Sequence, residues 1–263
     1  MYKQMPFERR SQEEIFRDID TLRACYSLEN PTFFLGDSNS LVLDTKKLVE
    51  VLAYLYKVFP SASRVTSYAR ARTVAKKTLE DLRLIRQAGL TRLHIGLETG
   101  DPELLEEIRK GATPEQMVQG ATRAKEAGFE VSLYVLAGIG GEEKWEQHAD
   151  GTASVLNQVD PHFIRIRTFV PTPGSPLWDR VREGTFAPAS AETILREQKR
   201  LIQQLEVSSE YLSDHISNYV PVYGRLPHEK ASMLETLEEA LTAIQRDDKY
   251  RRALEKKRYL THL

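Results

Sequence analysis

The sequence of 263 residues contains a single cysteine, Cys25, and has a formal net charge of −1. One thiol excludes an internal disulfide framework, so a cytoplasmic protein is expected. The near-neutral charge excludes a general attraction to nucleic acids or to anionic membranes. No apolar run is long enough to span a bilayer, and no signal peptide is predicted. These absences favour a globular protein with a small-molecule substrate and without a membrane or nucleic-acid partner.

Apolar runs alternate with helical patterns along the chain, as expected of an α/β protein. With 41% hydrophobic residues, the chain is long enough for one large domain or two small ones. The capping box Ser-Gln-Glu-Glu predicts a first helix from Ser11 to about Cys25, and Asp101 and Thr113 each precede a proline that begins a helix. Strands are predicted at 31–37, 63–68, 91–101, 129–141 and 162–170, and further helices at 45–59, 78–89, 142–157 and about 190–206.

Residues 86–100 and 125–141 repeat one plan: a helix end, an Ala-Gly pair, an apolar strand and a glycine-rich turn. Strand–helix units of this kind predict a parallel sheet that is buried on both faces. The sheet is either an open doubly wound sheet or a barrel. In both architectures the functional site lies at the C-terminal ends of the strands.

Carboxylates and glycines follow several of the predicted strands. The acids are Asp37, Glu98 and either Glu142 or Glu143. Each acid is also explained by a helix cap, and each glycine by a turn, but their convergence on one edge favours a site. Glu98 ends an apolar run between two glycines. A carboxylate there requires a polar partner, and the glycines allow a ligand to approach the backbone.

Two common nucleotide motifs do not fit the glycine-rich segment 137–141. The dinucleotide fingerprint G-x-G-x-x-G lacks its last glycine, and no acid ends the following strand. A P-loop is excluded, because no Gly-Lys-Ser/Thr follows a glycine loop.

The chain resembles the radical S-adenosylmethionine (SAM) enzymes in five segments that occur in the same order: FFLGDSNSL, VTSYARA, GLTRLHIGLETGDPELLEEIRKG, AGFEVSLYVLAGIGG and IRIRTFVPTPGSPL. The similarity runs from Met1 to about Ile244. It is to an iron–sulfur oxidoreductase branch distantly like the oxygen-independent coproporphyrinogen III oxidases, and SDHISNYVPVYGRLPHEK resembles that branch's signature. The resemblance implies an incomplete, TIM-like (β/α)6 barrel of parallel strands without its first strand at 1–185, and a C-terminal helical extension packed on it at 186–263.

The resemblance also implies SAM as a cofactor at the strand ends. Glu98 matches the acid that binds the ribose hydroxyls, and a carboxylate accepts two such hydrogen bonds well. Tyr68 and Arg70 are further expected contacts, although a solvated surface arginine explains Arg70 equally. Gly36, Asp37 and Ser38 match the loop that meets the methionine amino group, and Ala137, Gly138, Ile139, Gly140 and Gly141 match the loop along the adenine.

Four residues are candidates for substrate contacts. Arg165 and Arg167 alternate on the last predicted strand and therefore face the same side. If that side is the barrel lumen, they bind an anionic substrate; if it is the outside, a helix covers them. Asp214 and His215 either contact substrate or belong to a hydrogen-bonded turn. His94 is interpreted as a packed core residue.

The family's defining cysteine loop, C-x-x-x-C-x-x-C, is missing from this sequence. In complete members three thiolates hold a [4Fe–4S] cluster, which takes an electron from a reductant such as flavodoxin or ferredoxin. Cleavage of SAM then yields a 5′-deoxyadenosyl radical that abstracts hydrogen from the substrate. Cys25 is expected to be a small buried residue. We expect no metal site in this chain, an inactive enzyme in this form, and cluster cysteines upstream of Met1, which leaves strand 32–35 at the sheet edge.

Two other function classes remain open. A cluster-less SAM- or nucleotide-binding regulatory module predicts nucleotide binding without iron. A phosphate-handling barrel enzyme predicts a lysine or a helix N-terminus organised around phosphate after the last strands. The segment 171–177, Pro-Thr-Pro-Gly-Ser-Pro-Leu, supplies neither clearly.

Overall fold

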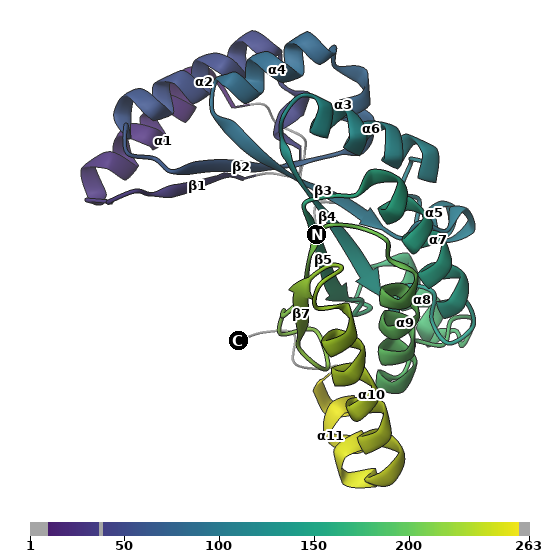
Figure 1. Cartoon of the computed structure of the whole chain (residues 1–263). Helices are drawn as coiled ribbons and strands as arrows, with labels where there is room; N and C mark the ends of the chain where they lie inside the picture. Colours follow the sequence, from purple (N-terminus) through teal and green to yellow (C-terminus); the bar gives the residue numbers. More distant parts are fainter. Residues whose placement is uncertain (1–9, 37–38, 258–263) are drawn as a thin grey trace.

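The computed structural model describes residues 10–36 and 39–257. Its seven strands form one sheet in chain order, with neighbours parallel from β1 to β6 and β7 antiparallel to β6. The sheet curves into an open arc and does not close into a barrel (Figure 1). The strands are β1 Thr32–Leu35, β2 Arg64–Ala69, β3 Leu90–Glu98, β4 Glu130–Ala137, β5 Phe163–Thr168, β6 Glu210–Ser213 and β7 Val222–Arg225.

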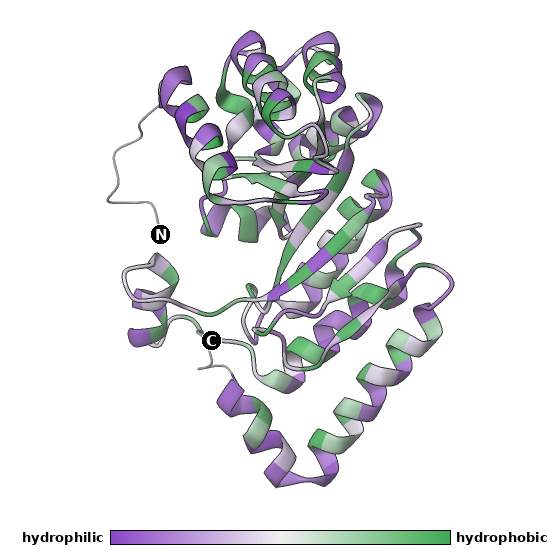
Figure 2. Cartoon of the chain, turned by 90° about the vertical axis from the view of Figure 1, so that its left-hand side faces the viewer, coloured by the Kyte–Doolittle hydropathy of each residue, from purple (hydrophilic) through white to green (hydrophobic). Residues whose placement is uncertain are grey.

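Most helices lie on the outer side of this arc (Figure 1). Figure 2 shows the molecule from the open side, with the strands near its centre. None of the helices described combines the length and the apolar character needed to cross a membrane. The helices are α1 Gln12–Cys25, the 3-10 helix η1 Ser40–Val42, α2 Thr45–Val58, α3 Ala71–Lys76, α4 Leu79–Gln87, α5 Pro102–Glu107, α6 Pro114–Glu126, α7 Trp145–Val159, α8 Pro176–Arg182, α9 Ala191–Gln204, α10 Lys230–Arg246 and α11 Asp248–Lys257.

The predicted α/β class and the five predicted strands are confirmed, with small differences at their ends. Strands β6 and β7 were missed, and they lie within 186–263, where only helix was expected. Each has four residues, which is too short for an alternating pattern to be recognised in the sequence. Strand β6 pairs with the free edge of β5, and β7 pairs with β6. Among the described residues β1 pairs with β2 alone, so it lies at the sheet edge as expected.

The predicted helix starts form for the expected local reason. Ser11 accepts a hydrogen bond from the Glu14 amide while the Glu14 side chain accepts one from the Ser11 amide, and Thr113 makes the same box with Gln116. Asp101 accepts from the Leu104 amide and caps α5. These short-range bonds satisfy amide groups that the first helical turn leaves unpaired.

The two faces of the sheet differ in chemistry. The outer face carries apolar residues such as Leu93, Val131 and Ile164, all fully buried in the main core under the helices. The opposite side is called the inner face here and carries Phe34, Tyr68, His94, Tyr134 and Arg165. Strand alternation therefore separates an apolar, helix-covered side from one lined with aromatic and basic groups.

Close packing behind the sheet fixes helix α3, which follows β2. A Cβ atom on Gly120 of α6 would lie only 2.3 Å from the carbonyl oxygen of Ala71. Only glycine therefore allows α6 to approach the first turn of α3 this closely. This contact positions α3 at the carboxyl end of β2, where the site begins.

Candidate functional site

A cavity of about 1060 Å³ opens at the carboxyl ends of β2 and β3 and extends along the inner face to β4. Strand ends supply Ala69, Gly96 and Glu98, and helix α3 forms one wall. The turn 108–112 after α5 forms another wall. This is the edge at which the alternating strand–helix pattern predicted a site, and its size is ordinary for small ligands.

Glu98 stands at the mouth of this cavity in an unusual backbone conformation. Its φ is +65°, and the pairing of β3 with β4 shifts register between Gly96 and Glu98. Its carboxylate Oε1 accepts a 2.7 Å hydrogen bond from Lys110 Nζ, and the two side chains are 21% and 25% exposed. A Cβ on Gly96 would lie 2.3 Å from that oxygen, so glycine leaves room for the side chain. A non-glycine residue with positive φ is strained and is often found at functional sites.

The turn after Glu98 packs directly against the backbone of α7. A Cβ on Gly100 would lie 2.1 Å from the Gly151 carbonyl oxygen. The Gly100 amide donates to Thr152 Oγ1 at 3.0 Å. The second glycine of the GLETG segment therefore serves helix packing rather than a ligand.

A buried polar network joins the ends of β3 and β4. His148 Nδ1 lies 2.8 Å from Thr99 Oγ1, and His148 Nε2 lies 3.4 Å from Glu197 Oε1. The Glu197 carboxylate also accepts the Gly138 amide at 2.9 Å. His148 and Glu197 are 1% and 2% exposed. Through this network α7 and α9 hold both strand-end turns in place.

The floor of the cavity is a cluster of rings. His94 lies 6.1 Å from the Tyr68 ring and 5.9 Å from the Tyr134 ring, and Phe34 contacts Tyr68 edge-on at 4.8 Å. Burial, together with the Arg165, Arg92 and Arg64 guanidinium groups, lowers the pKa of His94 from 6.5 to about 4. His94 is 8% exposed, as expected of a packed residue, but it also lines the cavity on the inner face.

The structure brings three of the expected SAM-contact residues together and separates others. Tyr68, Arg70 and Glu98 all line the cavity. Gly36 is not among the lining residues, and Asp37 and Ser38 lie outside the described residues. The next residue, Asn39, lines the cavity, and its side-chain oxygen accepts the Arg70 amide at 3.3 Å.

The expected adenine loop, 137–141, is buried and is not among the residues that line the cavity. Ala137 and Ile139 are 1% and 3% exposed, and α9 covers the turn through Ile194. The Gly138, Ile139, Gly140 and Gly141 segment therefore does not line the cavity in this structure. Glu142 also turns away from it, because its carboxylate accepts from Ser190 and Thr193 at the start of α9.

The four candidate substrate residues divide into two pairs. Arg165 and Arg167 share the inner face, where Arg167 lies over the Tyr134 ring at 5.7 Å. Asp214 and His215 are exposed, and His215 Nδ1 bonds Ser217 within its own turn at 2.8 Å. That turn is anchored to β5, since Ser217 Oγ accepts the Thr168 amide. This geometry agrees with the second explanation given for Asp214 and His215, a hydrogen-bonded turn.

Sequence reasoning missed most of the basic residues around the cavity. Of the described residues that line it, Glu98 is the one acid. The basic residues are Arg70, Arg72, Lys76, Arg109 and Lys110. Only Arg70 was expected, because the others lie on helix α3 and on the turn after α5, where charged side chains are usually solvated.

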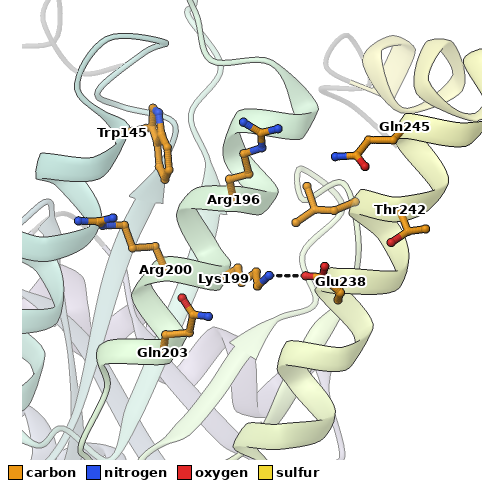
Figure 3. Close-up of a pocket in the computed structure, with 9 residues that line it drawn as sticks. Trp145, Arg196, Lys199, Arg200, Gln203, Glu238, Thr242 and Gln245 are labelled. Carbon is orange, nitrogen blue, oxygen red and sulfur yellow. Dashed lines mark hydrogen bonds and ion pairs between the residues drawn. The ribbon is translucent and has the colours of Figure 1, made fainter.

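A second hollow, of about 320 Å³, lies between α9 and α10 (Figure 3). Its basic groups all have acidic partners: Lys199 pairs with Glu238, Arg200 with Asp150 and Arg196 with Glu192. Satisfied charges of this kind point to a helix interface rather than to a ligand site.

The residues present do not fit an iron–sulfur cluster. Cys25 is exposed at the end of α1, which corrects the expectation that it is buried. The apolar side of α1 instead faces α2, where Phe16 stacks on Tyr54. Within residues 10–36 and 39–257 no group of three His, Cys, Asp or Glu side chains could hold a metal ion. One thiol in the whole sequence cannot supply three thiolate ligands.

Comparison with known proteins gives a family match. The model of the radical SAM superfamily matches residues 2–150. The chain is 24% identical to the heme chaperone HemW of Bacillus subtilis over 168 residues, which are 63% of this chain and 44% of that protein. It is 22% identical to an uncharacterized methyltransferase of Pyrococcus horikoshii over 171 residues, 64% of this chain and 35% of that protein. The chain thus spans less than half the length of these two relatives.

Solved structures with a similar fold belong to several different enzymes. The archaeal Elp3 of Methanocaldococcus infernus superposes with a TM-score of 0.57 at 12% identity, over 89% of this chain and 59% of that one. Methylornithine synthase gives 0.53 at 18%, over 89% and 62%. Coproporphyrinogen III oxidase from Escherichia coli gives 0.50 at 15%, over 67% and 46%. At these identities the similarity shows the fold alone, and it confirms the expected partial, TIM-like barrel.

The buried network predicts a large and specific loss of stability in the variant Glu197→Ala. Removing the carboxylate leaves the buried Gly138 amide without its acceptor and removes the acid that lies 3.4 Å from His148 Nε2, which costs about 1–3 kcal/mol. Urea unfolding followed by circular dichroism measures the change. The matched control is Glu192→Ala on the same helix, which removes only an exposed pair with Arg196 and should change stability little. Equal losses in both variants would contradict the assignment.

The low pKa of His94 predicts a pH-dependent stability. In the unfolded chain His94 titrates near its ordinary 6.5, so the unfolded state binds the proton first as pH falls, and folding stability falls between about pH 6.5 and 4. At pH 5 the loss relative to pH 7 is about 2 kcal/mol. His94→Gln should remove this part of the pH dependence in urea unfolding. The exposed His228→Gln variant should keep it, and an unchanged slope in His94→Gln would refute the prediction.

Proposed function

The chain belongs to the radical SAM superfamily, and from that premise we propose that its strand-end cavity binds S-adenosylmethionine. We propose that Glu98 binds the ribose hydroxyls, and that Tyr68 and Arg70 contribute further contacts. In this proposal the chain forms the SAM-binding part of a radical SAM oxidoreductase that acts on a small molecule. A reductant such as flavodoxin or ferredoxin serves the complete enzyme.

The geometry of Glu98 is the observation that carries this proposal. Its side chain reaches a cavity rather than a helix interface, and among residues 10–36 and 39–257 its one hydrogen-bond partner is Lys110, at Oε1. Carboxylate oxygens accept hydroxyl hydrogen bonds strongly, and the absence of a Cβ on Gly96 leaves space beside them. The strained φ of Glu98 is maintained by the packing of the next two residues on α7. Strain that the surrounding structure maintains in this way supports a functional part for the side chain.

The remaining residues that the resemblance assigned to SAM are proposed to have two other roles, support of the site and contact with the methionine end. The turn 137–141 supports the site, because its Gly138 amide is bound by Glu197. The loop with Gly36, Asp37 and Ser38 is proposed to meet the methionine end, next to Asn39 at the cavity. If SAM were held by these residues, it would supply radical chemistry in complete members of the family. The residues of this chain do not fit an iron–sulfur cluster, because a single cysteine cannot supply three thiolates.

A second candidate function is SAM or nucleotide binding without cleavage, in a regulatory module. The single cysteine favours it, because three thiolates are needed to hold the cluster. Both candidates use the same cavity and the same Glu98. They differ only in whether iron loading gives the protein a redox centre.

The variant Glu98→Gln tests SAM binding directly. A neutral amide keeps the size of the side chain but replaces charge-assisted hydrogen bonds by neutral ones, a loss of about 1–2 kcal/mol and therefore roughly 5- to 30-fold in Kd. Equilibrium dialysis with radiolabelled SAM measures this affinity. Glu103→Gln is the control, because Glu103 lies on α5 and pairs with Lys144 outside the cavity. Tight binding that Glu98→Gln leaves unchanged would disprove the ribose assignment.

Reconstitution with iron and sulfide separates the two candidate functions. We expect the purified chain to show no cluster absorbance band near full occupancy and to release no 5′-deoxyadenosine from SAM under a chemical reductant. Cys25→Ser should behave like the wild type, since one thiol cannot hold the cluster. A full-occupancy band in the wild type, lost in Cys25→Ser, would overturn the cluster-less interpretation.

A further inference from the structure

Unpaired polar atoms gather on the inner face of β3, β4 and β5. Seven buried side-chain nitrogen or oxygen atoms have no hydrogen-bond partner among the described residues. Four of them lie on this one face: His94 Nδ1, Ser132 Oγ, Arg165 Nε and Arg167 Nη1. Ser132 is fully buried and His94 is 8% exposed. Since buried polar groups in native proteins are nearly always paired, this concentration points to a ligand that pairs them.

The strand register holds these groups together. Arg165 is level with Tyr134 on the neighbouring strand, and Arg167 is level with Leu136. Ser132 is level with His94. The guanidinium of Arg165 lies near enough to His94 to contribute to its lowered pKa. The two arginines therefore form one basic patch, continuous through His94 and Tyr134 with the cavity.

A third arginine on the same face, Arg92, has its guanidinium paired. The Arg92 guanidinium donates to Glu130 at 2.8 Å and stacks over the Phe163 ring at 3.8 Å. Within the part of the chain that the structure describes, no carboxylate pairs with Arg165 Nε or Arg167 Nη1. The guanidinium groups without a carboxylate partner are therefore those of Arg165 and Arg167 on β5.

The wall of the cavity extends this positive field. Its described lining holds five basic residues and one acid, Glu98, and that acid is already paired with Lys110. Clefts lined by one sign of charge concentrate ligands of the opposite sign. Guanidinium groups bind carboxylates and phosphates in a planar, bidentate manner, which suits Arg165 and Arg167 to either anion.

We propose that the inner face at Arg165 and Arg167 is the substrate subsite and binds an anionic small molecule through its carboxylate or phosphate groups. The aromatic rings of Tyr134 and Tyr68 flank the path from this subsite to Glu98. As a substrate subsite the assignment rests on the proposed function, because the substrate must lie beside bound SAM. As an anion site it stands on the contacts of this face alone.

Calorimetric titration of the full chain with citrate and, separately, with inorganic pyrophosphate tests the anion site. We expect at least one of the two anions to bind, and Arg165→Gln and Arg167→Gln each to weaken that binding at least tenfold. Arg246→Gln, an exposed arginine on α10, is the control and should bind as the wild type does. Citrate binding alone identifies a carboxylate ligand, and pyrophosphate binding alone identifies a phosphate ligand.

A second readout covers the case in which an arginine variant fails to fold. In wild-type protein with labelled histidine, the bound anion should shift the ring resonances of His94 and leave those of His228 unchanged. The proposal is overturned if neither anion binds, if both arginine variants retain wild-type affinity, or if binding leaves His94 unaffected. Absence of SAM binding in parallel dialysis, with anion binding intact, would remove the proposed function and leave the anion site standing.

Discussion

The buried contact of His148 with Thr99 and Glu197 is the constraint on which the site depends. It ties the turn after β3 to α7, and through the Gly138 amide it ties the turn after β4 to α9. A pair of this kind is worth little to overall stability compared with an apolar replacement, but it has few alternative arrangements once it is buried. The strand ends are thus fixed by helices on the outer side, while the inner side stays available for ligands.

That fixed turn explains how a strained glutamate is tolerated. The positive φ of Glu98 costs free energy, which the close packing of Gly100 on Gly151 and the bond from its amide to Thr152 offset. Alternation along β3 sends its apolar residues into the core, whereas Glu98 emerges at the cavity with one carboxylate oxygen engaged by Lys110. The same separation of faces leaves Arg165 and Arg167 on the inner face, away from the apolar core under the helices.

Membership of the radical SAM superfamily fits an open, arc-shaped sheet, but this sequence lacks the three cysteines that hold the family's cluster. The chain has an open, mostly parallel sheet with a cavity at its strand ends, but it supplies a single thiol. It spans less than half the length of the two curated relatives described above. The scaffold does not need a cluster to form, because its core lies between the sheet and the outer helices. The SAM binding that we propose therefore does not depend on the cluster, which a single thiol cannot hold.

The sequence by itself determined the strand–helix order, the helix caps at Ser11, Asp101 and Thr113, and the place of Glu98 at a strand end. These features depend on periodicity and on bonds between residues three or four apart, which the sequence displays directly. Only the tertiary structure decided that β6 and β7 join the sheet, that α9 covers the turn 137–141, and that His94 faces inward near Arg165. Those outcomes depend on strand register and on helices distant in sequence, and a one-residue change in register would reverse which side chains meet.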